Sequence, residues 1–115
     1  MKKIALIAYD GDLTTFAHVL LYALDLHGKG YDVKVLIEGA ATRLIPEMIR
    51  PETPFANLYR EMLDNRLLAG VCESCSVRMG SFNSAQEQGL PIDGEMKGHP
   101  SLEPLINAGY EIITF

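Results

Sequence analysis

Stretches typical of buried strands alternate with helical patterns along the chain, and this alternation constrains the fold most. The run "KIALIAY" at residues 3–9 is continuously apolar, as expected of a strand buried on both faces. Residues 13–24 then repeat apolar side chains at helical spacing, between a capping Asp12 and the helix-ending Gly28 or Gly30. Because "YDVKVLIEG" at residues 31–39 reads as a second strand, residues 3–39 predict a right-handed βαβ unit.

The rest of the chain continues the alternation less regularly. We expect a short helix at residues 40–49 that is interrupted at Pro46, a second helix at 54–66 and a third buried strand at 67–72. A short helix within residues 73–88, a short strand near residues 90–92, a helix at 101–109 and a strand at 110–115 follow. The pattern predicts one domain over residues 1–115: a three-layer α/β/α sandwich around a mostly parallel sheet of four to five strands.

Composition excludes several classes of partner. The net charge is −5 and the ten basic residues are scattered, so we expect no nucleic acid as a partner. No apolar run approaches the roughly 20 residues that span a bilayer, so we expect no membrane insertion. The opening "MKKIALIAYDGD" has acidic residues where a signal peptide would have its cleavage site, which favours a cytoplasmic protein. The only two cysteines are three residues apart and cannot form a disulfide framework.

Polar and reactive side chains gather where the predicted parallel strands end. In open α/β sheets, ligands bind at the carboxyl ends of the strands. The candidate ligand-binding residues at that edge are Asp10, Asp12, Glu38, Gly39 and, one helical turn beyond the cysteines, Arg78. The candidate catalytic residues are Cys72 and Cys75, which fall at the junction of the third strand with the next helix.

The cysteine pair admits several interpretations. A structural zinc site needs two more ligands, and the histidines of the chain, His18, His27 and His99, are not spaced as a pair, so we expect no metal and no cofactor. A thioredoxin-like dithiol is less favoured, because such motifs follow an early strand and this one follows the third. A single reactive thiol that carries sulfur as a persulfide fits the strand end, and Arg78 would add positive charge. An inert buried cysteine is the alternative for either residue.

A second motif, near the start of the chain, does not involve the cysteines. The stretch "DGDLTT" at residues 10–15 matches the D-x-D-x-T motif of haloacid-dehalogenase-like phosphohydrolases, in which two aspartates work with magnesium. No acidic doublet follows a later strand, as that chemistry requires. We therefore favour Asp12 as a helix cap, with a magnesium-dependent phosphohydrolase that uses Asp10 and Asp12 as the weaker alternative.

Four stretches together carry a family resemblance: "KIALIAYDGD", "ALDLHGKGYDVKVLIEGAAT", "GVCESCSVRMG" and the terminal "LINAGYEIITF". In these stretches the chain resembles the DsrE/DsrF-like family, which includes TusD-type sulfur-relay subunits and small YchN-like proteins. The resemblance implies a flavodoxin-like sandwich that assembles into dimers, trimers or hexamers. It also implies persulfide transfer with a sulfur donor or acceptor protein, through a cysteine at the position of Cys72 or Cys75.

Two questions stay open within this resemblance. Between the cysteines we prefer Cys72, because it ends the strand, with Cys75 as a possible resolving thiol. Since family membership does not by itself make an enzyme, an oligomeric binding module of the same fold is the main alternative function. The proline-containing insert at residues 43–66 is unlike the shortest members and would shape a lid or an oligomer contact.

Overall fold

The computed structural model describes all residues 1–115 and contains one five-stranded sheet in which every strand pair is parallel. The strand order is β4-β3-β2-β1-β5, so the chain adds strands outward from β1 (Lys3–Ala8) and then returns to place β5 (Glu111–Thr114) on its other side. This arrangement confirms the predicted α/β class and the predicted parallel sheet.

The first βαβ unit forms as the sequence pattern predicts. Helix α1 (Leu13–Gly28) begins at Asp12, whose side chain accepts a hydrogen bond from the Thr15 backbone N–H, and β2 (Asp32–Ile37) follows. The apolar face of α1 is buried against the sheet through Phe16, Ala17, Val19, Leu20 and Ala23. Burial of this face supplies the hydrophobic free energy that holds α1 on β1 and β2.

The middle of the chain differs in part from expectation. The helix expected at residues 40–49 is a 3-10 helix, η1 (Gly39–Leu44), followed by turns, and the next helix, α2 (Ala56–Asp64), agrees with the prediction. Most large apolar side chains of this region enter the chain's own core: Met48, Tyr59 and Met62 are buried, whereas Ile49 and Phe55 are exposed. Most of the apolar content of this region therefore covers the sheet of its own subunit.

The last third is built from short elements. Strand β3 (Leu68–Cys72) is followed by two helices in place of the one expected, α3 (Glu73–Arg78) and α4 (Phe82–Glu87), which are separated at Gly80, a residue with a φ of +74°. Strand β4 (Ile92–Asp93) and helix α5 (Glu103–Asn107) come next.

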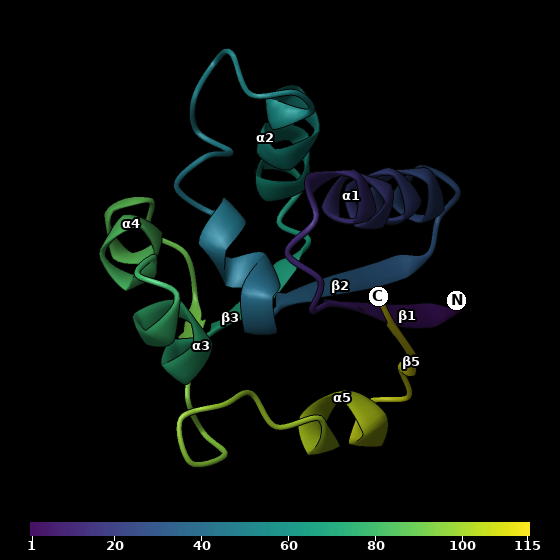
Figure 1. The fold of residues 1–115 in the computed structure, drawn as a ribbon. Coiled ribbons are helices and arrows are strands. Elements are labelled where there is room, and N and C mark those ends of the chain that lie inside the picture. Colours follow the sequence, from purple (N-terminus) through teal and green to yellow (C-terminus); the bar gives the residue numbers. More distant parts are fainter.

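The two faces of the sheet are covered unequally. Figure 1 shows α1 and α2 on one face and the short α5 on the other, with α3 and α4 beside the end of β3. Helix α5 has no buried residue, and the long segment between β4 and α5 contacts α3 through the hydrogen bond from Ser74 N to the Gly98 carbonyl. That segment brings residues from a distant part of the chain to the end of β3. No helix combines the length and the apolar character that crossing a bilayer requires.

Candidate functional site

The junction of β3 and α3 places the two cysteines about one helical turn apart. Cys72 is the last residue of the strand and the N-cap of α3, and its Sγ accepts a hydrogen bond from the Cys75 backbone N–H at 3.3 Å. An N-cap side chain normally satisfies one of the free N–H groups of the first helical turn, and here sulfur performs that role. Both cysteines are free thiols.

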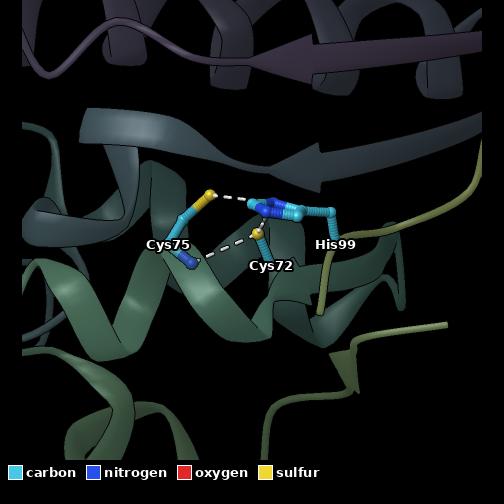
Figure 2. A group of neighbouring side chains, drawn as sticks. All are labelled: Cys72, Cys75 and His99. Atoms are coloured by element: carbon cyan, nitrogen blue, oxygen red, sulfur yellow. Dashed lines mark hydrogen bonds between the residues drawn. The ribbon is translucent and has the colours of Figure 1, made fainter. Parts of the chain in front are cut away.

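His99 joins the two cysteines from the segment between β4 and α5. Its Nδ1 atom lies 3.2 Å from Cys72 Sγ and 3.7 Å from Cys75 Sγ. Figure 2 shows both sulfurs at one end of the imidazole ring, and both contacts are made to the same ring nitrogen. No other three histidine, cysteine or acidic residues of the chain bring their ligand atoms together in this way.

Backbone contacts hold the histidine over the cysteines. The Ser74 N–H donates to the Gly98 carbonyl at 2.8 Å, and His99 pairs with Met96 through two backbone hydrogen bonds of 2.7 and 3.0 Å. Gly98 has a φ of +95°, and a Cβ atom at this position would overlap the Ser74 hydroxyl. A glycine is therefore required for this segment to approach α3 so closely.

A cavity of about 230 Å³ opens beside the cluster, and its lining consists of Gly39, Ser74, Cys75, Arg78, Met79 and His99. Cys75 is half-buried and reaches this cavity, whereas Cys72 is fully buried behind it. A small reactant can therefore meet the Cys75 thiol directly, and the two thiols are not equivalent.

The surroundings keep Cys72 in its neutral form. Burial is the main cause that raises the pKa of the Cys72 thiol to about 12; the adjacent Cys75 adds to the effect, and the charge of Glu38 contributes least. Because the thiolate is the nucleophile, a thiol with this pKa is a poor attacking group at neutral pH.

Glu38 is the buried carboxyl group of this edge. It is only 6% exposed, and its Oε2 atom has no hydrogen-bond partner. Burial, and secondarily the charge of Asp93, raise the pKa of Glu38. A buried carboxylate without a hydrogen-bond partner is costly in free energy.

The structure divides the predicted ligand-binding residues into two groups. Gly39 and Arg78 line the cavity, and Glu38 acts electrostatically on Cys72. Asp10 and Asp12 lie instead in the exposed turn before α1, where their carboxylates accept hydrogen bonds from the N–H groups of Asp12 and Thr15 at 2.8 and 3.0 Å. They form no acidic cluster with a third residue, which favours the capping role over the magnesium site.

The sequence interpretation missed His99. The sequence predicts no metal because its histidines are not spaced as a ligand pair. His99 lies 27 residues after Cys72 and 24 residues after Cys75. No local motif marks a ligand at such a distance. The available signal was the two glycines at 94 and 98, just before His99, which indicate close backbone approach rather than a histidine ligand.

Comparison with known proteins finds relatives but no established activity. No protein-family model matches the chain. A stretch of 41 residues, 36% of the chain, is 39% identical to an uncharacterised protein of Archaeoglobus fulgidus and covers 67% of that protein. A solved structure from Bacteroides thetaiotaomicron, the conserved protein of unknown function BT1422, superimposes with a TM-score of 0.69 over 98% of this chain and 95% of that one. At 18% identity this likeness shows the fold alone.

One relative matches along most of both sequences. The uncharacterised protein MJ0733 of Methanocaldococcus jannaschii is 30% identical over 104 residues, which are 89% of this chain and 81% of that protein. The chain therefore belongs to the same protein family as MJ0733.

Proposed function

We propose that the protein handles sulfane sulfur and carries it as a persulfide on Cys75. The observation that carries this proposal is the position of Cys75: its half-buried thiol faces a cavity of about 230 Å³ and lies 3.7 Å from His99 Nδ1. A reactive thiol needs access and a nearby group that accepts its proton, and Cys75 has both. Arg78 lines the same cavity and supplies positive charge that favours an anionic persulfide.

The transfer step requires only groups at this site and a persulfide donor. His99 Nδ1 takes the proton of the Cys75 thiol, and the resulting thiolate attacks the outer sulfur of the donor persulfide. The donor S–S bond breaks, and the donor thiolate leaves and takes up the proton. A bond between Cys75 Sγ and the transferred sulfur replaces the donor bond, so no external oxidant or reductant is needed. Attack by an acceptor thiolate on the same outer sulfur reverses the sequence.

Cys72 has a different role in this proposal from the one the sequence favoured. Its position at the strand end made it the preferred carrier, but it is fully buried and its pKa is raised to about 12. If Cys72 attacked the persulfide on Cys75, a disulfide would form and hydrosulfide would leave. A buried neutral thiol suppresses that discharge, so we assign sulfur carriage to Cys75 and positioning to Cys72.

The resemblance to the DsrE/DsrF-like family supports the same chemistry and adds partners to the proposal. It implies a sulfur donor or acceptor protein and assembly into dimers, trimers or hexamers. Exposed apolar side chains on α1 and on the edge strand β5 are consistent with self-association: Tyr22 is 46% exposed and Ile113 is 44% exposed. Light scattering on the purified chain measures the assembly directly.

Mass spectrometry after incubation with glutathione persulfide tests the proposal. The wild-type chain should gain about 32 Da, the mass of one sulfur atom, and peptide mapping should place it on Cys75. Cys75→Ser should abolish the adduct. Ser74→Ala, which changes a neighbouring cavity residue and keeps both thiols, is the matched control and should retain it.

Two results would contradict the proposal. An adduct that persists in Cys75→Ser and disappears in Cys72→Ser would return the carrier role to Cys72. Absence of any adduct on the folded wild-type chain, under conditions that load a free thiol peptide, would remove sulfur handling altogether.

A further inference from the structure

We propose that Cys72, Cys75 and His99 also bind a thiophilic divalent cation such as zinc, with a fourth coordination position that opens into the adjacent cavity. This inference does not depend on sulfur transfer. It rests on the placement of three side chains that offer one nitrogen and two sulfur ligands.

The distances between the ligand atoms fit a tetrahedral zinc ion. Zinc bonds of about 2.3 Å to sulfur and about 2.0–2.1 Å to nitrogen place tetrahedral S and N ligands about 3.6 Å apart, and two sulfurs about 3.8 Å apart. The observed S···N distances of 3.2 and 3.7 Å bracket the first value, and all three ligand atoms lie within 4.8 Å of one another. The two sulfurs would have to approach each other by up to about 1 Å to bind one ion together with the nitrogen.

The two sulfurs converge on one ring nitrogen, which can form a hydrogen bond with only one of them at a time. Nδ1 of a histidine carries either one hydrogen or one lone pair, so it forms one good hydrogen bond. Cys72 Sγ at 3.2 Å and Cys75 Sγ at 3.7 Å therefore compete for this one position, although Cys72 can also donate to the Gly98 carbonyl oxygen at 3.8 Å. A single cation would satisfy all three atoms at once.

The ligands are held in place before any ion binds. Two residues lie between Cys72 and Cys75, a spacing that is common for cysteine pairs on zinc. The hydrogen bond from the Cys75 N–H to Cys72 Sγ orients the first sulfur. The Ser74 N–H bond to the Gly98 carbonyl fixes the segment that carries His99 against α3. Preorganisation of this kind lowers the ordering entropy that metal binding would otherwise cost.

Three protein ligands and an adjoining space correspond to an open coordination site. Structural zinc sites are closed by four protein ligands, whereas sites with three leave a position for water or a reactant. Here the cavity lined by Cys75 and His99 adjoins the cluster. The buried Glu38, whose Oε2 has no partner, adds negative charge near Cys72, and a cation would offset this charge.

Cobalt titration of the full chain, reduced and free of metal, tests the site. Co²⁺ on two thiolates should produce thiolate-to-metal charge-transfer absorption that saturates at one ion per chain. Zn²⁺ should bleach this absorption, and excess Mg²⁺ should not, because hard cations prefer oxygen ligands. His99→Ala should weaken Co²⁺ affinity at least about tenfold. His18→Ala removes an exposed histidine of α1 and should leave the affinity unchanged.

Circular dichroism identifies any variant that fails to fold, and His99→Asn, which changes less volume, then replaces His99→Ala. Lack of charge-transfer absorption in the folded wild-type chain would overturn the site. Unchanged cobalt affinity in a folded His99 variant, or one ion shared by two chains, would overturn it as well. The persulfide measurement is carried out with a chelator present, so failure of one proposal is distinguishable from failure of the other.

Discussion

Two junctions between a strand and a helix lie at the same edge of the sheet and share one local geometry. At the end of β1, the Asp12 side chain caps α1 by accepting a hydrogen bond from Thr15 N at 3.0 Å. At the end of β3, the Cys72 side chain caps α3 by accepting one from Cys75 N at 3.3 Å. In both cases a side chain satisfies a free N–H group of the first helical turn, three residues along the chain.

The junctions differ in what lies over them. The aspartate turn is open to solvent, and its polar groups are satisfied by neighbours in sequence. The cysteine turn is covered by the segment that carries His99, which buries Cys72 completely and brings a third ligand atom to both sulfurs. The same capping geometry is therefore structural in one place and a candidate site in the other, and the covering segment makes the difference.

The largest expected effect concerns the ionisation of the buried cap. A pKa raised to about 12 leaves little Cys72 thiolate at neutral pH, and burial, the main cause of the rise, persists when Cys75 is replaced by serine. In a Cys75→Ser chain, iodoacetamide should label native Cys72 at least about 100-fold more slowly than Cys72 of the same chain in urea. Peptide mass spectrometry over time gives both rates. Labelling rates within tenfold of each other would mean that the cover over Cys72 opens readily.

The second prediction loosens the covering segment. Gly98→Ala places a Cβ atom at an unfavourable φ of +95° and forces the Ser74 hydroxyl to rotate, so it should lower the free energy of unfolding by about 2 kcal/mol. Gly80→Ala, at a φ of +74° with open space around it, should lower it by only about 1 kcal/mol. Urea unfolding measures both. Faster alkylation of Cys72 in Gly98→Ala alone would link the segment to the site, and equal losses in the two variants would contradict the close packing.

The third prediction concerns the open junction. Asp12→Ala should lower the free energy of unfolding by about 1 kcal/mol, because α1 loses its side-chain cap, and should leave the persulfide adduct unchanged. Asp25→Ala is the matched control, since it removes an exposed ion pair of 3.0 Å with Lys29 in the same helix and should change stability by a few tenths of a kcal/mol. Magnesium-dependent hydrolysis of a phosphate ester that disappears in Asp10→Asn would instead restore the phosphohydrolase interpretation.

The contrast between the junctions also explains what the sequence could predict. Hydrophobic periodicity is local information, so it identified the strands, α1, the Asp12 cap and the strand-end position of Cys72. The short elements of the last third were predicted less well. Helices of six residues, such as α3 and α4, are decided by tertiary contacts and by one glycine with a positive φ.

The candidate site was predicted only in its local part. Cys72 and Cys75 are three residues apart and could be assigned to one junction, whereas the approach of His99 depends on how the segment after β4 folds back across the edge of the sheet. The choice between the cysteines depended on burial, which follows from the same segment. Sequence patterns within one element carry no information about such a cover.

The smallest expected effect compares a buried carboxyl group with an exposed one at the same edge. Burial and the charge of Asp93 raise the pKa of Glu38 above its ordinary value, so the folded chain binds this proton more tightly than the unfolded chain does. Its contribution to stability is thus complete below the ordinary pKa and is lost as the pH rises through the folded value. Glu38→Gln should therefore raise the urea midpoint at pH 7 relative to wild type, and the difference should shrink toward pH 4.

Asp10→Asn is the control for this comparison, because its carboxylate is exposed and the substitution should leave the urea midpoint nearly unchanged at both pH values. A Glu38→Gln midpoint below that of wild type at pH 7 would mean that the carboxylate has a partner that stabilises its charge. The candidate partner is a cation on Cys72, Cys75 and His99, so repeating the measurement with added zinc separates the two explanations. If the buried carboxylate and the ion act on each other, added zinc should raise the urea midpoint of wild type more than that of Glu38→Gln. Equal increases in the two midpoints would mean that they do not.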